Sequence, residues 1–329
     1  MKQKLDKNSA LRLLLYCAAA IISLILARVM GSVLLSVILC TVSVAFFTMM
    51  FSTVGIPAIL PSLIPIIVIC FSESVISALS SLTIVIIAAS FGLSARKKLR
   101  PVETILIASA IFIVFSAALA VLEIIATNGN FSVKESLGNI VTILDKTLAG
   151  IAETYKTATG HTISNISYIS STLKSMLVGV VLSSYIAATS FYYMLTVLCA
   201  KLVRESSIYK GKKSFEILPS RISAWVFIVC AVISLVFAVN HADVRFYTHL
   251  PTNIIVVLSP LFIFAGIYYV FNVKYKVERT SPVFTIIVLV ASLLFGLVQF
   301  IPLYFAFSGI TYTLRYNTQH SITSKDDSQ

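Results

Sequence analysis

Long apolar segments are the feature that most limits what this chain can fold into. Nine segments approach or exceed the length that a membrane-spanning α-helix needs, which is about 20 mostly apolar residues. No water inside a bilayer can pair with backbone N–H and C=O groups, so a spanning segment must pair them within the protein. Continuous apolar runs of this length favour helices. The nine apolar segments cover residues 13–29, 32–51, 57–71, 75–93, 104–125, 173–203, 222–239, 252–271 and 283–307.

The composition agrees with a membrane protein. Hydrophobic residues make up 58% of the chain and charged residues only 12%, against about 25% charged residues in soluble domains. We therefore predict an all-α fold, a polytopic transmembrane helical bundle of about eight or nine spans. The segment 57–71 is short and contains Pro57, Pro61 and Pro65. A spanning helix and a broken or re-entrant helix are the alternatives there.

The positions of lysine and arginine orient the chain. Cytoplasmic loops of membrane proteins carry an excess of these residues, so we place the N-terminus in the cytoplasm and predict a multi-pass membrane protein. The basic residues assigned to the cytoplasmic side are Lys2, Lys4, Lys7, Arg12, Arg96, Lys97, Lys98, Arg100, Lys201, Arg204, Lys210, Lys212, Lys213, Arg221, Lys274, Lys276 and Arg279. Arg28, Arg245 and Arg315 fall on the outer side in this assignment.

The net charge of +12 therefore belongs to the cytoplasmic face. Such a face attracts anionic lipid headgroups. We expect no nucleic-acid partner, because no basic domain stands clear of the membrane.

The chain divides into five parts. A basic cytoplasmic N-terminus covers residues 1–12, and an N-terminal bundle of about five spans covers 13–125. An extracytoplasmic part with an amphipathic helix and a polar loop covers 126–172. A C-terminal bundle of about four spans covers 173–307, and a polar C-terminal tail covers 308–329. The segment 133–155 carries apolar residues at steps of three and four, which is typical of an amphipathic helix. This outer helix either covers the bundle along the membrane surface or acts as a lid or docking face.

No enzyme motif is present. The sequence has no glycine-rich phosphate loop, no GxGxxG, no HExxH and no GxSxG, so we expect no catalytic residues and no cofactor. None of the five cysteines belongs to a CxxC pair. His241, Asp243 and His249 share one loop, but their spacing matches no metal-binding pattern, and we expect no metal site.

A few polar residues at or near membrane depth are candidates for a binding site. Such residues are costly in hydrocarbon and tend to face the interior of a bundle. We predict that they approach one another around an outward-facing cavity. The alternative is that each lies at a helix end and reaches to the headgroups. The five candidates are Arg28, Glu73, Glu123, Asn253 and Gln299.

The order of features from residue 173 onward resembles a known family. A long helix ends in basic residues, a short basic loop leads to a helix that contains a tryptophan, and each of the last two helices contains a glycine. The residues that carry the resemblance are Lys201, Arg204, Phe215, Leu218, Pro219, Trp225, Asn253, Gly266, Gly296 and Arg315. This pattern resembles the YybS-like family of bacterial membrane proteins, whose domain has no known function.

The N-terminal half of that family is similar to the substrate-binding subunits of energy-coupling-factor transporters. The resemblance implies binding of a small molecule from outside, together with a separate coupling subunit and separate ATPases. We therefore expect a non-enzymatic protein of the bacterial inner membrane that captures or passes a small solute. The alternative is a membrane scaffold that binds another envelope protein. A solute protein predicts a polar-lined cavity between helices, whereas a scaffold predicts a filled bundle and an exposed apolar patch on the outer helix.

Overall fold

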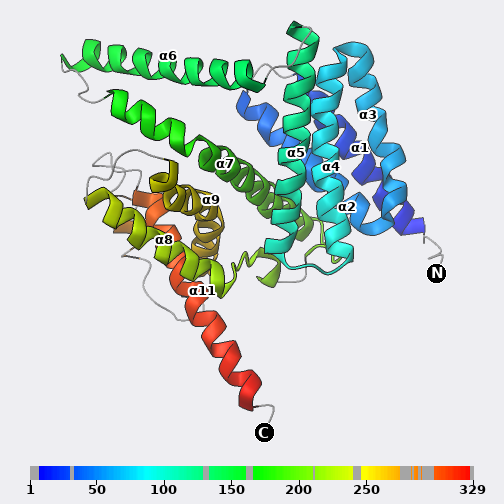
Figure 1. Ribbon diagram of the computed structural model, residues 1–329. Coiled ribbons are helices and arrows are strands. Elements are labelled where there is room, and N and C mark those ends of the chain that lie inside the picture. The colour runs from blue at the N-terminus through cyan, green and yellow to red at the C-terminus, as the bar shows by residue number, and fades with distance from the viewer. Residues whose placement is uncertain are drawn as a thin grey trace. The chain divides into compact units, whose positions relative to one another are not determined.

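The computed structural model describes residues 7–29, 33–128, 133–160, 166–209, 212–239, 246–274, 283, 285–287, 290 and 300–326. Helices joined by short turns make up this described part, which contains no strand (Figure 1). The predicted all-α class is thus confirmed at the level of helical architecture.

The helices follow the apolar segments closely. In chain order they are α1 (Lys7–Val29), α2 (Val33–Val54), the 3-10 turn η1 (Ile56–Ala58), α3 (Ile59–Ser72), α4 (Val75–Arg96), α5 (Pro101–Asn128), α6 (Val133–Thr159), α7 (Ile166–Leu202), the 3-10 turn η2 (Lys212–Phe215), α8 (Arg221–Val239), α9 (Phe246–Tyr268), the π-helical turn η3 (Tyr269–Lys274) and α11 (Phe300–Asp326).

Seven helices within the described residues are long and apolar enough to cross a membrane. They contain the stretches Ala10–Val29, Leu35–Val54, Val75–Arg96, Pro101–Ala126, Ser170–Leu202, Arg221–Val239 and His249–Lys274. The protein is therefore a helical membrane protein by length and composition. About half of the last predicted span, 283–307, lies outside the described residues.

The proline-rich segment forms the turn η1 followed by one continuous helix, α3. Gly55 precedes the turn with a φ of 82°, a left-handed conformation that glycine adopts without strain. Pro57 lies in the turn and Pro65 lies inside α3. The 14 residues of α3 extend about 21 Å at the helical rise per residue, which is shorter than the roughly 30 Å hydrocarbon core of a bilayer.

Together, η1 and α3 connect the two ends of α4. Before η1, Gly55 lies against the guanidinium group of Arg96 at the end of α4. After α3, Ser74 caps the start of α4 by accepting a hydrogen bond from the backbone N–H of Ser77 at 3.2 Å. The helices α3 and α4 therefore pack antiparallel to one another (Figure 1).

The helices group into two compact units. Unit 1 contains Met1–Leu119, Tyr185–Arg221 and Pro260–Gln329, and unit 2 contains Ala120–Ser184 and Ile222–Ser259. The boundaries fall inside α5, α7 and α9, so each of these helices contributes residues to both units.

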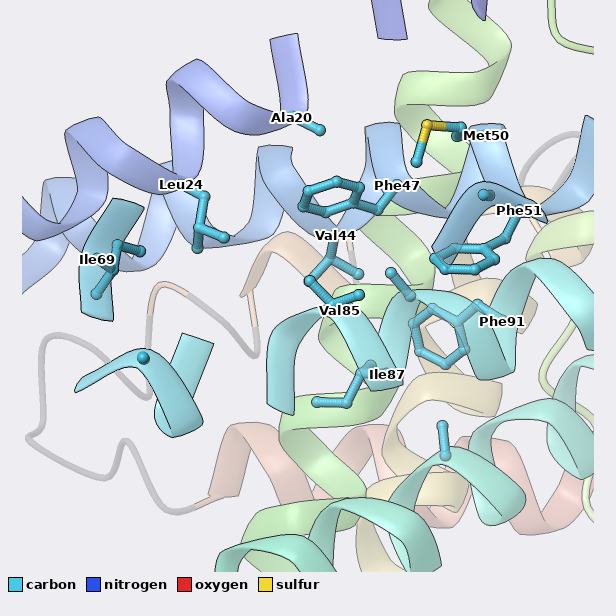
Figure 2. Close-up of a cluster of buried hydrophobic side chains, with 14 residues drawn as sticks. Ala20, Leu24, Val44, Phe47, Met50, Phe51, Ile69, Val85, Ile87 and Phe91 are labelled. Carbon is cyan, nitrogen blue, oxygen red and sulfur yellow. The ribbon is translucent and has the colours of Figure 1, made fainter. Parts of the chain in front are cut away.

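The core of unit 1 is built from α1, α2 and α4. Figure 2 shows Phe47 and Phe51 of α2 among side chains from the neighbouring helices, including Leu24 of α1 and Phe91 of α4. All four are at most 2% exposed. Because α2 is apolar on every face, it suits this position between other helices.

Close contact between α2 and α4 depends on Gly92. A Cβ atom at this position would lie 2.8 Å from the carbonyl oxygen of Thr48 and 2.9 Å from the backbone nitrogen of Ser52. Small residues permit this backbone approach between membrane helices. Beside this contact, the Thr48 hydroxyl donates to the carbonyl of Ala88 at 3.3 Å.

The C-terminal part of unit 1 has a second glycine contact. Gly266 of α9 meets the backbone of Phe305, and Gly309 of α11 meets the backbone of Phe262. Further along α11, Tyr312 stacks on Tyr269 with ring centroids 5.1 Å apart.

The position of Tyr312 differs from what the charge pattern indicated. Its hydroxyl donates to Oε1 of Glu216 at 2.5 Å, so this part of α11 lies beside the segment that follows α7. The charge assignment placed Arg315, three residues later, on the opposite side from that segment. In addition, α11 continues as a helix through polar sequence to Asp326, where composition alone indicated a tail.

Unit 2 is held by polar contacts between its helices. Asp145 of α6 accepts hydrogen bonds from Lys174 at 2.8 Å and from Ser170 at 2.6 Å. The hydroxyls of Ser234 in α8 and Thr252 in α9 lie 3.1 Å apart. The predicted amphipathic helix is observed as α6, and Ile143 and Ile151 on it are 63% and 56% exposed.

Candidate functional site

Several helix ends of unit 1 meet where basic residues gather. The Tyr16 hydroxyl of α1 donates to Oε2 of Glu205, just after α7, at 3.0 Å. The hydroxyls of Ser52, near the end of α2, and Ser207 lie 2.8 Å apart. The residues following α4 and α7 therefore share one end of unit 1, which we call the basic end. Its basic residues are Arg96, Lys97, Lys98, Arg100, Lys201 and Arg204.

A cavity of about 340 Å³ lies at the basic end. Its volume falls within the range of about 300–1,000 Å³ that is usual for small-molecule sites. Most of the lining surface is apolar, but half of the lining residues are polar or charged, namely Thr48, Lys98, Thr104, Thr196, Ser207 and Ser214. The other half is apolar or aromatic and consists of Phe91, Ala95, Leu99, Pro101, Tyr193 and Ile208. The lining therefore contains a cation and several hydroxyls but no carboxylate.

The aromatic wall of the cavity is firmly positioned. The rings of Phe91 and Tyr193 meet edge to face, with centroids 5.7 Å apart and an interplanar angle of 83°. The Tyr193 hydroxyl donates to the carbonyl oxygen of Ser214 at 3.2 Å. These contacts fix α4, α7 and the segment after α7 around the cavity.

Thr196 contributes a hydroxyl that has no protein partner. The residue is 1% exposed, and its Oγ1 atom makes no hydrogen bond. A threonine in a helix commonly donates to a carbonyl one turn back, as Thr189 does to Tyr185 at 2.8 Å. An unpaired buried hydroxyl costs about 1–3 kcal/mol, and such a group calls for an explanation. Its place in the cavity lining makes a bound molecule the natural partner.

Lys98 lies on the cavity in a strained backbone conformation. Its φ is 57°, in the left-handed region, where a helix end usually carries glycine. The backbone N–H of Leu99 reaches back to the carbonyl of Ser94 at 3.1 Å and closes the end of α4. Arg204 ends α7 in the same way, with a φ of 59°, but does not line the cavity. Strained residues of this kind concentrate at functional sites.

The carboxylates at the basic end have other partners. Glu205 accepts from Tyr16 and, through its second oxygen, from the backbone N–H of Ser207 at 3.2 Å. Glu103 accepts from the backbone N–H of Arg100 at 3.0 Å and so caps α5. Lys98 makes no ion pair within the described part of the chain. Its ammonium group is therefore available to a molecule in the cavity.

The predicted site residues of unit 1 lie away from this cavity. Arg28, in the last turn of α1, donates to the Ser77 carbonyl at 3.1 Å, to the Ser81 hydroxyl at 2.9 Å and to the Ser80 hydroxyl. Glu73 is exposed at the end of α3. The structure thus gives Arg28 a ring of serines on α4 as its partners rather than Glu73.

Of the predicted residues in unit 2, Asn253 has the best-defined surroundings. Its side-chain oxygen accepts from the backbone N–H of Gly179 at 3.0 Å, and its side-chain nitrogen donates to the carbonyl of Ser175 at 2.9 Å. Asn253 therefore joins α9 to α7. Glu123 is exposed on α5. Gln299, the fifth predicted residue, lies outside the described residues.

The histidine loop is only partly described. His241 and Asp243 lie outside the described residues, while the carbonyl of His249 accepts from Asn253 at 3.1 Å. In the described part of the chain, no group of three or more His, Cys, Asp or Glu residues is placed to hold a metal ion.

Sequence reasoning missed the residues that define the cavity. In the sequence, Lys98 belongs to a basic run that orients the chain, and Thr196 lies within an apolar span. One signal was present for Lys98, because the chain has a basic residue where the end of α4 would favour glycine. For Thr196 no comparable signal exists, because most threonines in spanning helices pair with their own backbone.

The chain was also compared with known proteins. The comparison found no matching family model, no similar curated protein and no similar solved structure.

Proposed function

We propose that the protein is a multi-pass protein of the bacterial inner membrane whose basic end faces the cytoplasm, with eight or nine spans. The convergence of basic segments at one end of unit 1 supports this orientation, because lysine and arginine are enriched on the cytoplasmic side. In this arrangement the N-terminus is cytoplasmic, and the basic residues contact anionic lipid headgroups.

We further propose that the protein is not an enzyme and that it binds or passes a small solute. The observation that carries this proposal is the cavity of about 340 Å³ at the basic end, whose lining residues include Lys98 and Thr196, a threonine with a buried, unpaired hydroxyl. A filled bundle with no internal polar site is what a pure scaffold would have. In the proposed orientation the cavity is on the cytoplasmic side, which suits passage of a solute across the membrane.

The resemblance to the YybS-like family, and through it to binding subunits of energy-coupling-factor transporters, points to the same class of function. Such a protein would work with a separate coupling subunit and would need no ATPase of its own. Those binding subunits take their ligand from outside. We propose that the outer part of the path taken by the solute involves Arg28, Glu73, Glu123, Asn253 and Gln299.

A scaffold that binds another envelope protein is the second candidate, and α6 supports it. Ile143 and Ile151 are exposed on that helix, and exposed apolar strips on an outer helix are typical of contact with a partner or with the membrane surface.

Thermal-shift screening of the purified full chain against vitamins and related solutes separates the two candidates. A ligand that binds the folded state raises the melting temperature by mass action. We expect at least one solute to stabilise the wild type, and the variant Ala95→Phe, which fills the cavity, to lose the effect. Ala126→Phe places the same side chain at an exposed position on α5 and should keep it.

No stabilisation by any compound of a wide panel would contradict solute binding and favour the scaffold. Stabilisation that survives Ala95→Phe would show that the solute binds elsewhere.

A further inference from the structure

We propose that the cavity at the basic end takes a small organic acid, with the acid group at Lys98 and Thr196 and an apolar, ring-sized body against Phe91 and Tyr193. This inference rests on the proposed function, because it names the class of solute that the same cavity binds. It is carried by the combination, in one lining, of a cation, several hydroxyl-bearing residues and two aromatic rings.

The charge of the ligand follows from Lys98. It is the one charged residue in the cavity lining, it has no carboxylate partner within the described chain, and its backbone adopts the left-handed conformation. Glycine would relieve that strain. A lysine in this position is explained if its ammonium group binds a molecule in the cavity. An ammonium group binds a negatively charged group most strongly.

The hydrogen-bonding pattern of the ligand follows from Thr196. Its buried Oγ1 makes no hydrogen bond to the protein, so its hydroxyl hydrogen is free to be donated. A carboxylate has two oxygens that accept hydrogen bonds. It can therefore accept from the Thr196 hydroxyl and from the Lys98 ammonium group together. A neutral amide or alcohol could accept the hydrogen bond from Thr196 but would leave the positive charge of Lys98 without a counter-charge.

The body of the ligand follows from the apolar wall. The edge-to-face pair of Phe91 and Tyr193 presents aromatic surface to the cavity, and Leu99 and Ile208 add aliphatic surface. Aromatic side chains favour stacked or edge-to-face contact with another ring. Inorganic anions would leave this wall without a partner, so the lining favours an organic acid.

Benzoate and benzamide test the inference, because the two molecules differ mainly in charge. We would titrate each into the purified full-length protein in detergent and measure the dissociation constant by calorimetry. We expect benzoate to bind at least about tenfold more tightly than benzamide, since a charge-assisted hydrogen bond is roughly twice as strong as a neutral one.

Two matched pairs of variants locate the site. Lys98→Gly and Arg204→Gly each remove one positive charge and one left-handed non-glycine residue, but only Lys98 lines the cavity. Thr196→Val and Ser190→Ala each remove a buried hydroxyl without a partner, and only Thr196 lines the cavity. We expect Lys98→Gly and Thr196→Val to weaken benzoate binding at least about fivefold, and the two controls by less than about twofold.

Three results would overturn the inference. Equal binding of benzoate and benzamide, lost in Ala95→Phe, would keep the proposed solute cavity and remove the preference for acids. Equal weakening by Lys98→Gly and Arg204→Gly would show that benzoate responds to general surface charge. Absence of binding by either probe, with another solute of the wide panel still bound in the cavity, would refute the acid class alone.

Discussion

Some charged side chains in this protein are held by specific short-range partners, and Asp145 of α6 is the best-defined case. Its carboxylate accepts hydrogen bonds from Lys174 and Ser170 of α7. These hydrogen bonds, with that from Lys174 the larger cause, lower the pKa of Asp145 from its ordinary value of 3.8. Arg28 provides the contrasting case, because its guanidinium group is held by serine oxygens of α4.

Asp145 should make the stability of unit 2 depend on pH. Its pKa is lower in the folded state than in the unfolded state, so its contribution is present above pH 3.8 and is lost as the pH falls through the lower folded value. We expect Asp145→Asn to lower the melting temperature at neutral pH, and the difference from the wild type to shrink in acid.

The matched control for this prediction is Glu153→Gln, which removes an exposed carboxylate from the same helix. Circular dichroism melts of both variants across the pH range measure the effect. An unchanged melting temperature for Asp145→Asn at neutral pH would show that the contact between α6 and α7 does not contribute to stability.

At the scale of elements, the helices pack through glycines at a few points. Gly92 lets α4 approach α2, and Gly266 and Gly309 let α9 and α11 meet backbone to backbone. Lipid-facing and protein-facing surfaces of membrane helices are equally apolar, so close packing rather than hydrophobicity favours association.

Gly92→Ala should destabilise the contact between α2 and α4. The added methyl group would lie within 2.9 Å of two backbone atoms of α2, and such overpacking costs about 1–3 kcal/mol. Gly138→Ala in α6 is the control, because a Cβ atom there would meet no atom within 4 Å. That change should cost nothing and should add up to about 1 kcal/mol of helix stability.

Titration with a denaturing detergent measures the free energy of unfolding of both glycine variants. Equal stability of Gly92→Ala and the wild type would mean that α2 and α4 are further apart than described.

The elements themselves could be predicted from the sequence, because a span depends on the length and composition of one continuous segment. The amphipathic helix α6 was predictable for the same reason. The cavity was not, because Thr48 of α2, Lys98 after the end of α4 and Thr196 of α7 meet only through tertiary packing. Asn253 shows the same limit, since its polarity at membrane depth was visible but its partners on α7 were not.

At the scale of the whole molecule, the distribution of charge is the feature that joins structure and proposed function. The structure brings the segments after α4 and α7 to one end of unit 1, and the cavity lies there as well. We expect this end to face the cytoplasm, because translocating so many lysines and arginines is unfavourable. The turn between α3 and α4, which contains Glu73, should then face outward.

Cysteine labelling in oriented membrane vesicles tests this account most directly. The five native cysteines would be replaced, and Ser207→Cys at the cavity and Glu73→Cys at the turn would be introduced one at a time. With a maleimide that cannot cross membranes, we expect Ser207→Cys to react only in inside-out vesicles and Glu73→Cys only in right-side-out vesicles. Reaction of Ser207→Cys in right-side-out vesicles would contradict the orientation of the basic end and, with it, a cytoplasmic position for the cavity.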